Sequence, residues 1–234
     1  MKVDVYKKYH ADIVKVWEMG EKIPEFKNIY NLNAFTQDFL YENTILFLGV
    51  GASDGEKELK DGTRRKKTCT IKNSGNCEYH YEREEGRIKY DYYKKMIKLA
   101  KITGFENWSN IDITLFRETR QKIIRPFYKN FTKIMQAHFD LAKKMIIYIK
   151  PKVIIASNAF VRDVIKGDAY IDTGFILLDD KKTIHKYGTP LINSPDELKN
   201  IPIFFTSMLS GAGALDNGSF DRLSWHIKYV LERL

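Results

Sequence analysis

Two aspartates and several glycines are the residues of this 234-residue chain whose types and positions could serve chemistry on a bound ligand. Gly49, Gly51, Ser53 and Asp54 follow one another at the end of the apolar run TILFLGVG, and Asp112 lies in SNIDITLF. Glycines let backbone N–H groups approach a phosphate or a base closely, because no Cβ stands in the way. An aspartate beside them can activate water or accept hydrogen bonds from a base edge.

Structural roles for these residues stay open. An aspartate after a glycine turn most often forms the turn or caps a helix, which applies to Asp54. An aspartate beside a strand makes a structural hydrogen bond about as often as a ligand contact, which applies to Asp112. A second candidate loop ends the apolar run IPIFFTSMLSGAG, where Met208, Ser210 and Gly211 follow one another.

Common cofactor and catalytic motifs are absent from the sequence. GVGASDGEK has too few glycines for a dinucleotide fingerprint and lacks the Gly-Lys-Ser/Thr end of a P-loop, and GxSxG occurs nowhere. Cys69 and Cys77, with His80 nearby, do not have the paired spacing of a structural zinc site, so we interpret them as reduced thiols. We therefore expect no cofactor and no metal.

Apolar patterning predicts the elements that must position these residues. Four short runs rich in β-branched and aromatic residues predict strands near residues 44–49, 111–116, 152–156 and 202–206. Helical spacing predicts helices over about 5–19, 90–102, 131–149, 159–165 and 220–234. Strands alternating with helices indicate an α/β three-layer sandwich, with a central four-stranded, mainly parallel sheet flanked by helices.

This architecture brings the candidate loops together. The carboxyl ends of parallel strands meet at one edge of the sheet, where ligands bind in open α/β folds. Residues 49–56, 117–121, 157–160 and 207–213 would form that edge. We expect one domain over residues 1–234, with a polar loop excursion at about 53–87.

The charge balance indicates the kind of partner. The chain has 39 Lys+Arg against 30 Asp+Glu, a formal net charge of +9 and a pI near 9.3, which favours DNA or another polyanion. Six cations near the expected edge could contact a nucleic-acid backbone, although a charge run is also typical of a solvated loop. They are Arg64, Arg65, Lys66, Lys67, Arg117 and Arg120.

The hydropathy pattern argues against a membrane partner. No apolar run approaches the ~18 to 20 residues that cross a bilayer, and the first residues lack a signal-peptide core. We expect a cytoplasmic monomer.

Four segments of the chain resemble the uracil-DNA glycosylase superfamily. NIYNLNAFTQDFLYENTILFLGVGAS is similar to the entry of the single-strand-selective type, and HFDLAKKMIIYIKPKVIIASNAF to the helix, Lys-Pro and strand in the middle of these proteins. SNIDITLFRETR stands where the family offers an asparagine to the flipped base, and IPIFFTSMLSGAG where a strand ends in a His-Pro-Ser loop. The resemblance spans roughly residues 28–231 and implies base excision in DNA repair.

The two catalytic loops depart from the family pattern. Gly51 and Ala52 stand where the family has a water-positioning Asp, Asn or Glu and a proline, and Met208 stands where it has a histidine that stabilises the leaving base. Methionine donates no hydrogen bond to an anion. We expect slow excision of plain uracil, with Asp54 replacing the missing carboxylate and Asp112 reading the base.

Two other hypotheses remain. The chain could be a catalytically inactive nucleic-acid or nucleotide-binding protein of the same fold, or an unrelated α/β enzyme on a small phosphorylated ligand. The missing carboxylate and histidine separate excision from mere binding, and the long basic excursion favours a polymer over a small ligand.

Overall fold

A central parallel sheet organises the protein. The structure is a computed structural model that describes residues 1–26, 39–51, 91–116, 121–165, 201–209 and 214–233. Four strands lie in the order β4-β3-β5-β6, and every neighbouring pair is parallel. They are β3 (Ile45–Gly49), β4 (Trp108–Asp112), β5 (Val153–Ala156) and β6 (Ile203–Phe205). The predicted fold class is confirmed.

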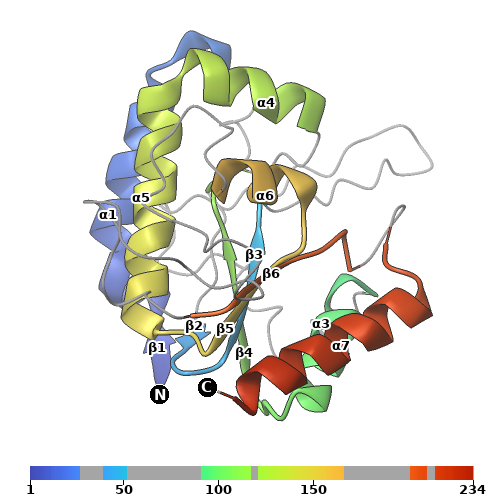
Figure 1. Cartoon of the computed structure of the whole chain (residues 1–234). Coiled ribbons are helices and arrows are strands. Elements are labelled where there is room, and N and C mark those ends of the chain that lie inside the picture. The colour runs from blue at the N-terminus through green and yellow to red at the C-terminus, as the bar shows by residue number, and fades with distance from the viewer. Residues whose placement is uncertain (27–38, 52–90, 117–120, 166–200, 210–213, 234) are drawn as a thin grey trace, which may run out of the picture.

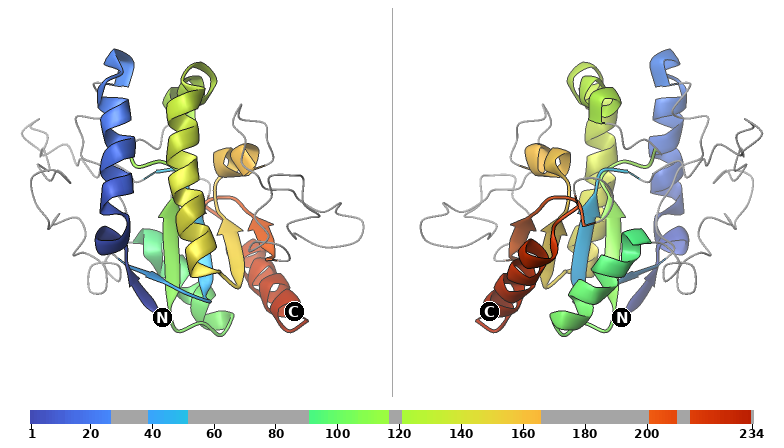
Figure 2. Two further views of the ribbon diagram at one scale, coloured as in Figure 1. Left: turned by 90° about the vertical axis from the view of Figure 1, so that its left-hand side faces the viewer. Right: turned by 90° about the vertical axis from the view of Figure 1, so that its right-hand side faces the viewer.

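Helices cover both faces of this sheet (Figures 1 and 2). The described helices are α1 (Val5–Glu21), α3 (Asp91–Ile102), α4 (Gln121–Asn130), α5 (Thr132–Ile149), α6 (Ala159–Ile165) and α7 (Asn217–Leu231). Side chains alternate across each strand, so Leu46 and Leu48 pack with α1, α4, α5 and α6, while Ile45 and Phe47 pack with α3 and α7. We call these sides the α5 face and the α7 face.

Several helix ends follow from local chemistry. The Asp4 carboxylate accepts a hydrogen bond from Lys7 N–H (2.8 Å) and caps α1, and the Asp216 carboxylate caps α7 through Ser219 N–H (2.9 Å). Helix α5 ends at Lys150 in the left-handed conformation, directly before Pro151. Gly104 follows the end of α3 with a φ of +87°, which is typical of a glycine that ends a helix. Helix α1 ends at Glu21, with Lys22 as its C-cap.

The second core strand lies earlier than predicted. We expected residues 111–116, but β4 is Trp108–Asp112, because Trp108 pairs with Ile45 at the start of β3. Ile113 N–H and Thr114 N–H still bond to the carbonyls of Gly49 and Val50 (2.9 and 3.0 Å), and the chain then leaves the sheet. Residues 113–116 (ITLF) are buried although they are not part of a strand, and this burial explains their apolar pattern.

Some elements were not predicted. Strands β1 (Lys2–Asp4) and β2 (Phe39–Tyr41) form a small antiparallel sheet, and Pro24–Phe26 form a 3-10 turn, η1. Helix α4 was missed because Pro126 lies in its middle, where proline removes a backbone hydrogen bond. Among the described residues, no helix is long and apolar enough to cross a membrane.

Candidate functional site

The chain order of the strands marks one position along the carboxyl edge of the sheet. β4 follows β3 on one side, and the chain then crosses to place β5 on the other side of β3. In open α/β sheets, ligands bind where the strand order reverses in this way. Here that point lies between the end of β3, which leads into Gly49–Gly51, and the end of β5, which leads into Ser157 and Asn158.

Asp112 lies beside this point. It is the last residue of β4 and pairs in register with Gly49, the last residue of β3. Trp108 of the same strand packs in the α7-face core, so by strand alternation Asp112 belongs to that face as well. Burial raises the pKa of the Asp112 carboxyl from 3.8 to about 7. Near neutral pH this group can therefore either accept or donate a hydrogen bond.

Asn110 is a second polar residue on the same face, and it was not among the site residues predicted from the sequence. It is two residues before Asp112 and only 2% exposed. Its side-chain oxygen Oδ1 is buried and has no hydrogen-bond partner among the described residues. Because a buried acceptor without a partner costs free energy, a group that supplies a donor here would be bound favourably. The spacing N-x-D inside a strand was the signal that could have identified it.

Two hydroxyl residues continue this polar row across the sheet. Ser157 follows Ala156, which pairs with Leu48, and Ser157 is buried. Thr206 follows Phe205 of β6, and its N–H donates to the carbonyl of Ala156 (3.0 Å). The carboxyl edge therefore ends in Asp112, Gly49, Ser157 and Thr206, in that order along the sheet.

The segment that follows β6 is held at this edge by backbone contacts. Leu215 N–H donates to the Met208 carbonyl (2.9 Å), and the Lys95 ammonium of α3 donates to the Leu215 carbonyl (2.6 Å). Leu209 is buried in the α7-face core, whereas the Met208 side chain is 40% exposed. Met208 thus lies just beyond the end of β6 and contributes neither a charge nor a donor.

Four of the predicted site residues lie in the described part of the chain. Gly49 and Asp112 are brought together, Gly51 follows β3 with partial burial, and Met208 follows β6. The others lie outside the described residues. They are Ser53, Asp54, Arg64, Arg65, Lys66, Lys67, Arg117, Arg120, Ser210 and Gly211.

A buried histidine supports the edge from the α5 face. His138 of α5 is 1% exposed, and its Nδ1 accepts a hydrogen bond from Leu115 N–H (3.2 Å). The Phe116 ring meets its ring edge-on at 5.4 Å. Burial lowers the pKa of His138 to about 3, so the ring is neutral and remains an acceptor. His138 thereby holds the backbone that leads from β4 toward α4.

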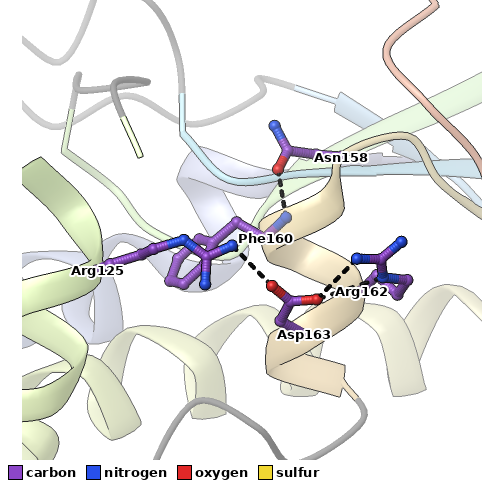
Figure 3. Close-up of polar contacts among 5 residues, drawn as sticks. All are labelled: Arg125, Asn158, Phe160, Arg162 and Asp163. Atoms are coloured by element: carbon purple, nitrogen blue, oxygen red, sulfur yellow. Dashed lines mark hydrogen bonds and ion pairs between the residues drawn. The ribbon is translucent and has the colours of Figure 1, made fainter. Parts of the chain in front are cut away.

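Charged residues of α4 and α6 form a cluster at the same end of the sheet (Figure 3). Arg125 of α4 bonds to the Asp163 carboxylate of α6 (2.7 Å), and Arg162 bonds to its other oxygen (3.1 Å). These two arginines hold the pKa of Asp163 below its usual range. Asn158 caps α6, since its Oδ1 accepts a hydrogen bond from Phe160 N–H (2.8 Å).

In the part of the chain that the structure describes, no cluster of His, Cys, Asp and Glu could hold a metal ion. Cys69, Cys77 and His80 lie outside that part. In comparisons with known proteins, neither a family model nor a curated protein matched the chain.

Proposed function

We propose that this protein binds DNA with one extruded base at the carboxyl edge of the sheet, as a divergent relative of the uracil-DNA glycosylases. The observation that carries the proposal is the pairing of Asp112 with Gly49, two residues from the buried acceptor of Asn110. A glycine with hydrogen-bonding groups beside it suits a flat heterocycle, because the ring can lie against backbone while its edge meets the polar side chains.

The two polar side chains would read complementary groups on the base. The Asn110 oxygen accepts a hydrogen bond from a ring N–H or an exocyclic amine. The Asp112 carboxyl, with a pKa of about 7, accepts such a bond when ionised and donates one to a base carbonyl or ring nitrogen when protonated. A base with both donors and acceptors on one edge would therefore match the site.

The proposed reaction is hydrolysis of the N-glycosidic bond. The bond between C1′ and the base nitrogen breaks, the water oxygen bonds to C1′, and the water proton ends on the departing base. Protonated Asp112 could stabilise that base by donating to it, while Asp54 is our proposed water-activating group. Met208 offers no such donor, so we expect plain uracil to leave slowly.

The test is an excision assay on single-stranded and duplex oligonucleotides that carry uracil, hypoxanthine, xanthine or an oxidised pyrimidine. We expect release of one unusual base, reduced at least about tenfold in Asp112→Asn. Asp221→Asn is the matched control, because Asp221 is an exposed carboxylate on α7 with no place in the site. Absence of both base release and oligonucleotide binding would contradict the proposal.

Met208 specifically favours a second candidate, a protein of the same fold that binds nucleic acid without excision. An exposed methionine is a poor electrostatic stabiliser for a leaving anion. Binding that depends on Asn110 and Asp112, with no release of any of the four bases, would support this candidate over the first.

A further inference from the structure

We propose that the exposed face of α4, extended by Lys133 of α5 and Arg162 of α6, binds the phosphate backbone of the nucleic acid whose base enters the carboxyl edge. This inference rests on the proposed function and adds the surface that would hold the strand. We call this surface the α4 basic face. Its members are Lys122, Arg125, Lys129, Lys133 and Arg162.

The α4 basic face follows from the helical period. Ile124 and Tyr128, four residues apart, are buried on one side of α4, and Lys122, Arg125 and Lys129 are exposed on the other. A row of cations on one helix face is the usual electrostatic footprint of nucleic-acid binding in a protein with a pI above 9.

The position of α4 places these cations at the same end of the sheet as the candidate site, on its α5 face (Figure 1). α4 begins nine residues after Asp112, the carboxyl end of β4, and α6 begins three residues after the carboxyl end of β5. The bond from Arg125 to Asp163 joins the two helices (2.7 Å). Figure 1 shows both helices at the same end of the sheet. A strand whose base enters at Asp112 and Gly49 from the α7 face would reach α4 by crossing the carboxyl edge to the α5 face.

The charge of this region is strongly one-sided. Helix α4 and the first turn of α5 carry no carboxylate, and α6 carries only Asp163. Within these three segments there are therefore five cations and one carboxylate. Among the described residues, Lys122, Lys129 and Lys133 form no ion pair, so a phosphate would not have to displace a described carboxylate from them.

The spacing of the lysines suits a phosphate backbone. Lys129 lies about two turns after Lys122, which corresponds to about 10 Å along the helix axis. One strand of B-DNA has a phosphate about every 3.4 Å along its axis, so the face spans about three phosphates.

The two arginines are already oriented at the end of this row. Asp163 bonds to both guanidinium groups, and the Arg125 guanidinium lies over the Phe160 ring at 4.9 Å from its centroid (Figure 3). An arginine held in this way loses less side-chain entropy when it meets a phosphate.

The experiment measures the affinity of the full chain for a fluorescein-labelled 20-nucleotide single strand and its duplex, by anisotropy, from 25 to 200 mM NaCl. In Lys122→Gln/Lys129→Gln/Lys133→Gln we expect the slope of log K against log[NaCl] to fall by about 2 for the single strand. Each lost phosphate contact removes about 0.7 from that slope. The affinity at 100 mM NaCl should drop about 10²-fold.

The matched control removes the same charge elsewhere. Lys101, Lys150 and Lys152 are exposed, and they lie toward the amino ends of β4 and β5, at the opposite edge of the sheet. Lys101→Gln/Lys150→Gln/Lys152→Gln should change the affinity by less than about threefold. All six side chains are exposed, so both triple variants should unfold at the parent temperature.

The outcomes separate this inference from the proposed function. Equal losses in the two triple variants, or an unchanged slope in the α4 variant, would overturn the α4 basic face and leave nucleic-acid binding standing. Absence of binding by the parent protein even at 25 mM NaCl would overturn both.

Discussion

Two polar sites lie on opposite faces of the sheet around β4, and they differ in how well their groups are satisfied. On the α5 face, His138 accepts the Leu115 N–H and meets the Phe116 ring. On the α7 face, Asn110 has a buried side-chain oxygen to which no residue in the described ranges donates, and burial raises the pKa of the Asp112 carboxyl. A satisfied polar group holds the fold together, whereas an unsatisfied one weakens it unless a ligand completes it.

This contrast distinguishes structure from function better than burial does. His138 and Asn110 are almost equally buried, at 1% and 2% exposure. Titratable side chains deep in a core are common candidates for a catalytic base, yet the hydrogen bond and the ring contact of His138 assign it to structural support. The asparagine, which does not titrate, is the stronger candidate for ligand contact.

The largest expected effect comes from giving the candidate site the groups that it lacks. Gly51→Asp with Met208→His should raise uracil excision by about 10²-fold or more, because each restored group acts on charge that develops in the transition state. Excision kinetics on a uracil oligonucleotide provide the measurement, with Gly51→Ala/Met208→Leu as the control.

Ordinary uracil excision by the parent protein would show that our matching of these two loops to the family is wrong. Asp54→Asn would then decide whether the carboxylate three residues later has taken over. Loss of excision in that variant would identify Asp54 as the explanation.

The next effect tests the structural side of the comparison. His138→Leu leaves the buried Leu115 N–H without an acceptor, which should lower the free energy of unfolding by about 1–3 kcal/mol. Oligonucleotide affinity at a temperature where the variant is folded should stay within about twofold of the parent. Urea denaturation measures the first quantity, and a large loss of affinity in the folded variant would contradict the supporting role.

The two titratable groups should give opposite dependences of stability on pH. The pKa of Asp112 is about 7 in the folded protein and near 3.8 when unfolded, so its contribution to stability falls as pH rises through that window. His138, with a folded pKa of about 3 against 6.5, makes a contribution that is lost as pH falls below 6.5. In the parent protein, these two opposite changes of stability with pH partly cancel.

In Asp112→Asn, only the His138 contribution to the pH dependence of stability should therefore remain of these two. At pH 8 the variant should be more stable than the parent by about 1–2 kcal/mol. This is less than the full pKa shift implies, because water reaches part of the carboxyl. At pH 4 the two proteins should be equally stable. Thermal unfolding between pH 4 and 8 provides the measurement. Equal stability of the two proteins at pH 8 would show that the Asp112 pKa is not raised.

The smallest expected effect compares two neighbours on β4. Asn110→Leu removes an unsatisfied acceptor and should stabilise the fold by about 1 kcal/mol while weakening oligonucleotide binding. Ser109, on the opposite face, accepts a hydrogen bond from Tyr41 N–H (2.8 Å) and donates to the Tyr41 carbonyl (3.1 Å). Ser109→Ala should destabilise by about 1 kcal/mol without affecting binding. If Asn110→Leu destabilised the fold and Ser109→Ala weakened binding, the assignment of Asn110 to ligand contact and of Ser109 to the fold would be wrong.

Local patterning was enough to predict most of the helices and the layered fold. α5 was predicted to within one residue because its apolar positions repeat at the helical period and Pro151 ends it. α6 and the start of α1 were predicted for similar reasons, and the order of strands and helices indicated a parallel sheet. Gly49 was selected because it stands at the end of an apolar run, and Asp112 because it lies near the position at which the family offers an asparagine to the base.

Pairing between distant segments decided what the sequence by itself could not. Which residues of SNIDITLF form a strand depends on their register with β3. In the observed register, β4 starts three residues earlier than predicted and includes Asn110, which thereby lies in the candidate site. α4 forms despite Pro126 because Ile124 and Tyr128 are buried in the α5-face core. The sequence by itself thus determined most of the elements and the edge at which they meet. Only tertiary structure decided which polar groups lie there unsatisfied, since a hydrogen-bond partner can come from any part of the chain.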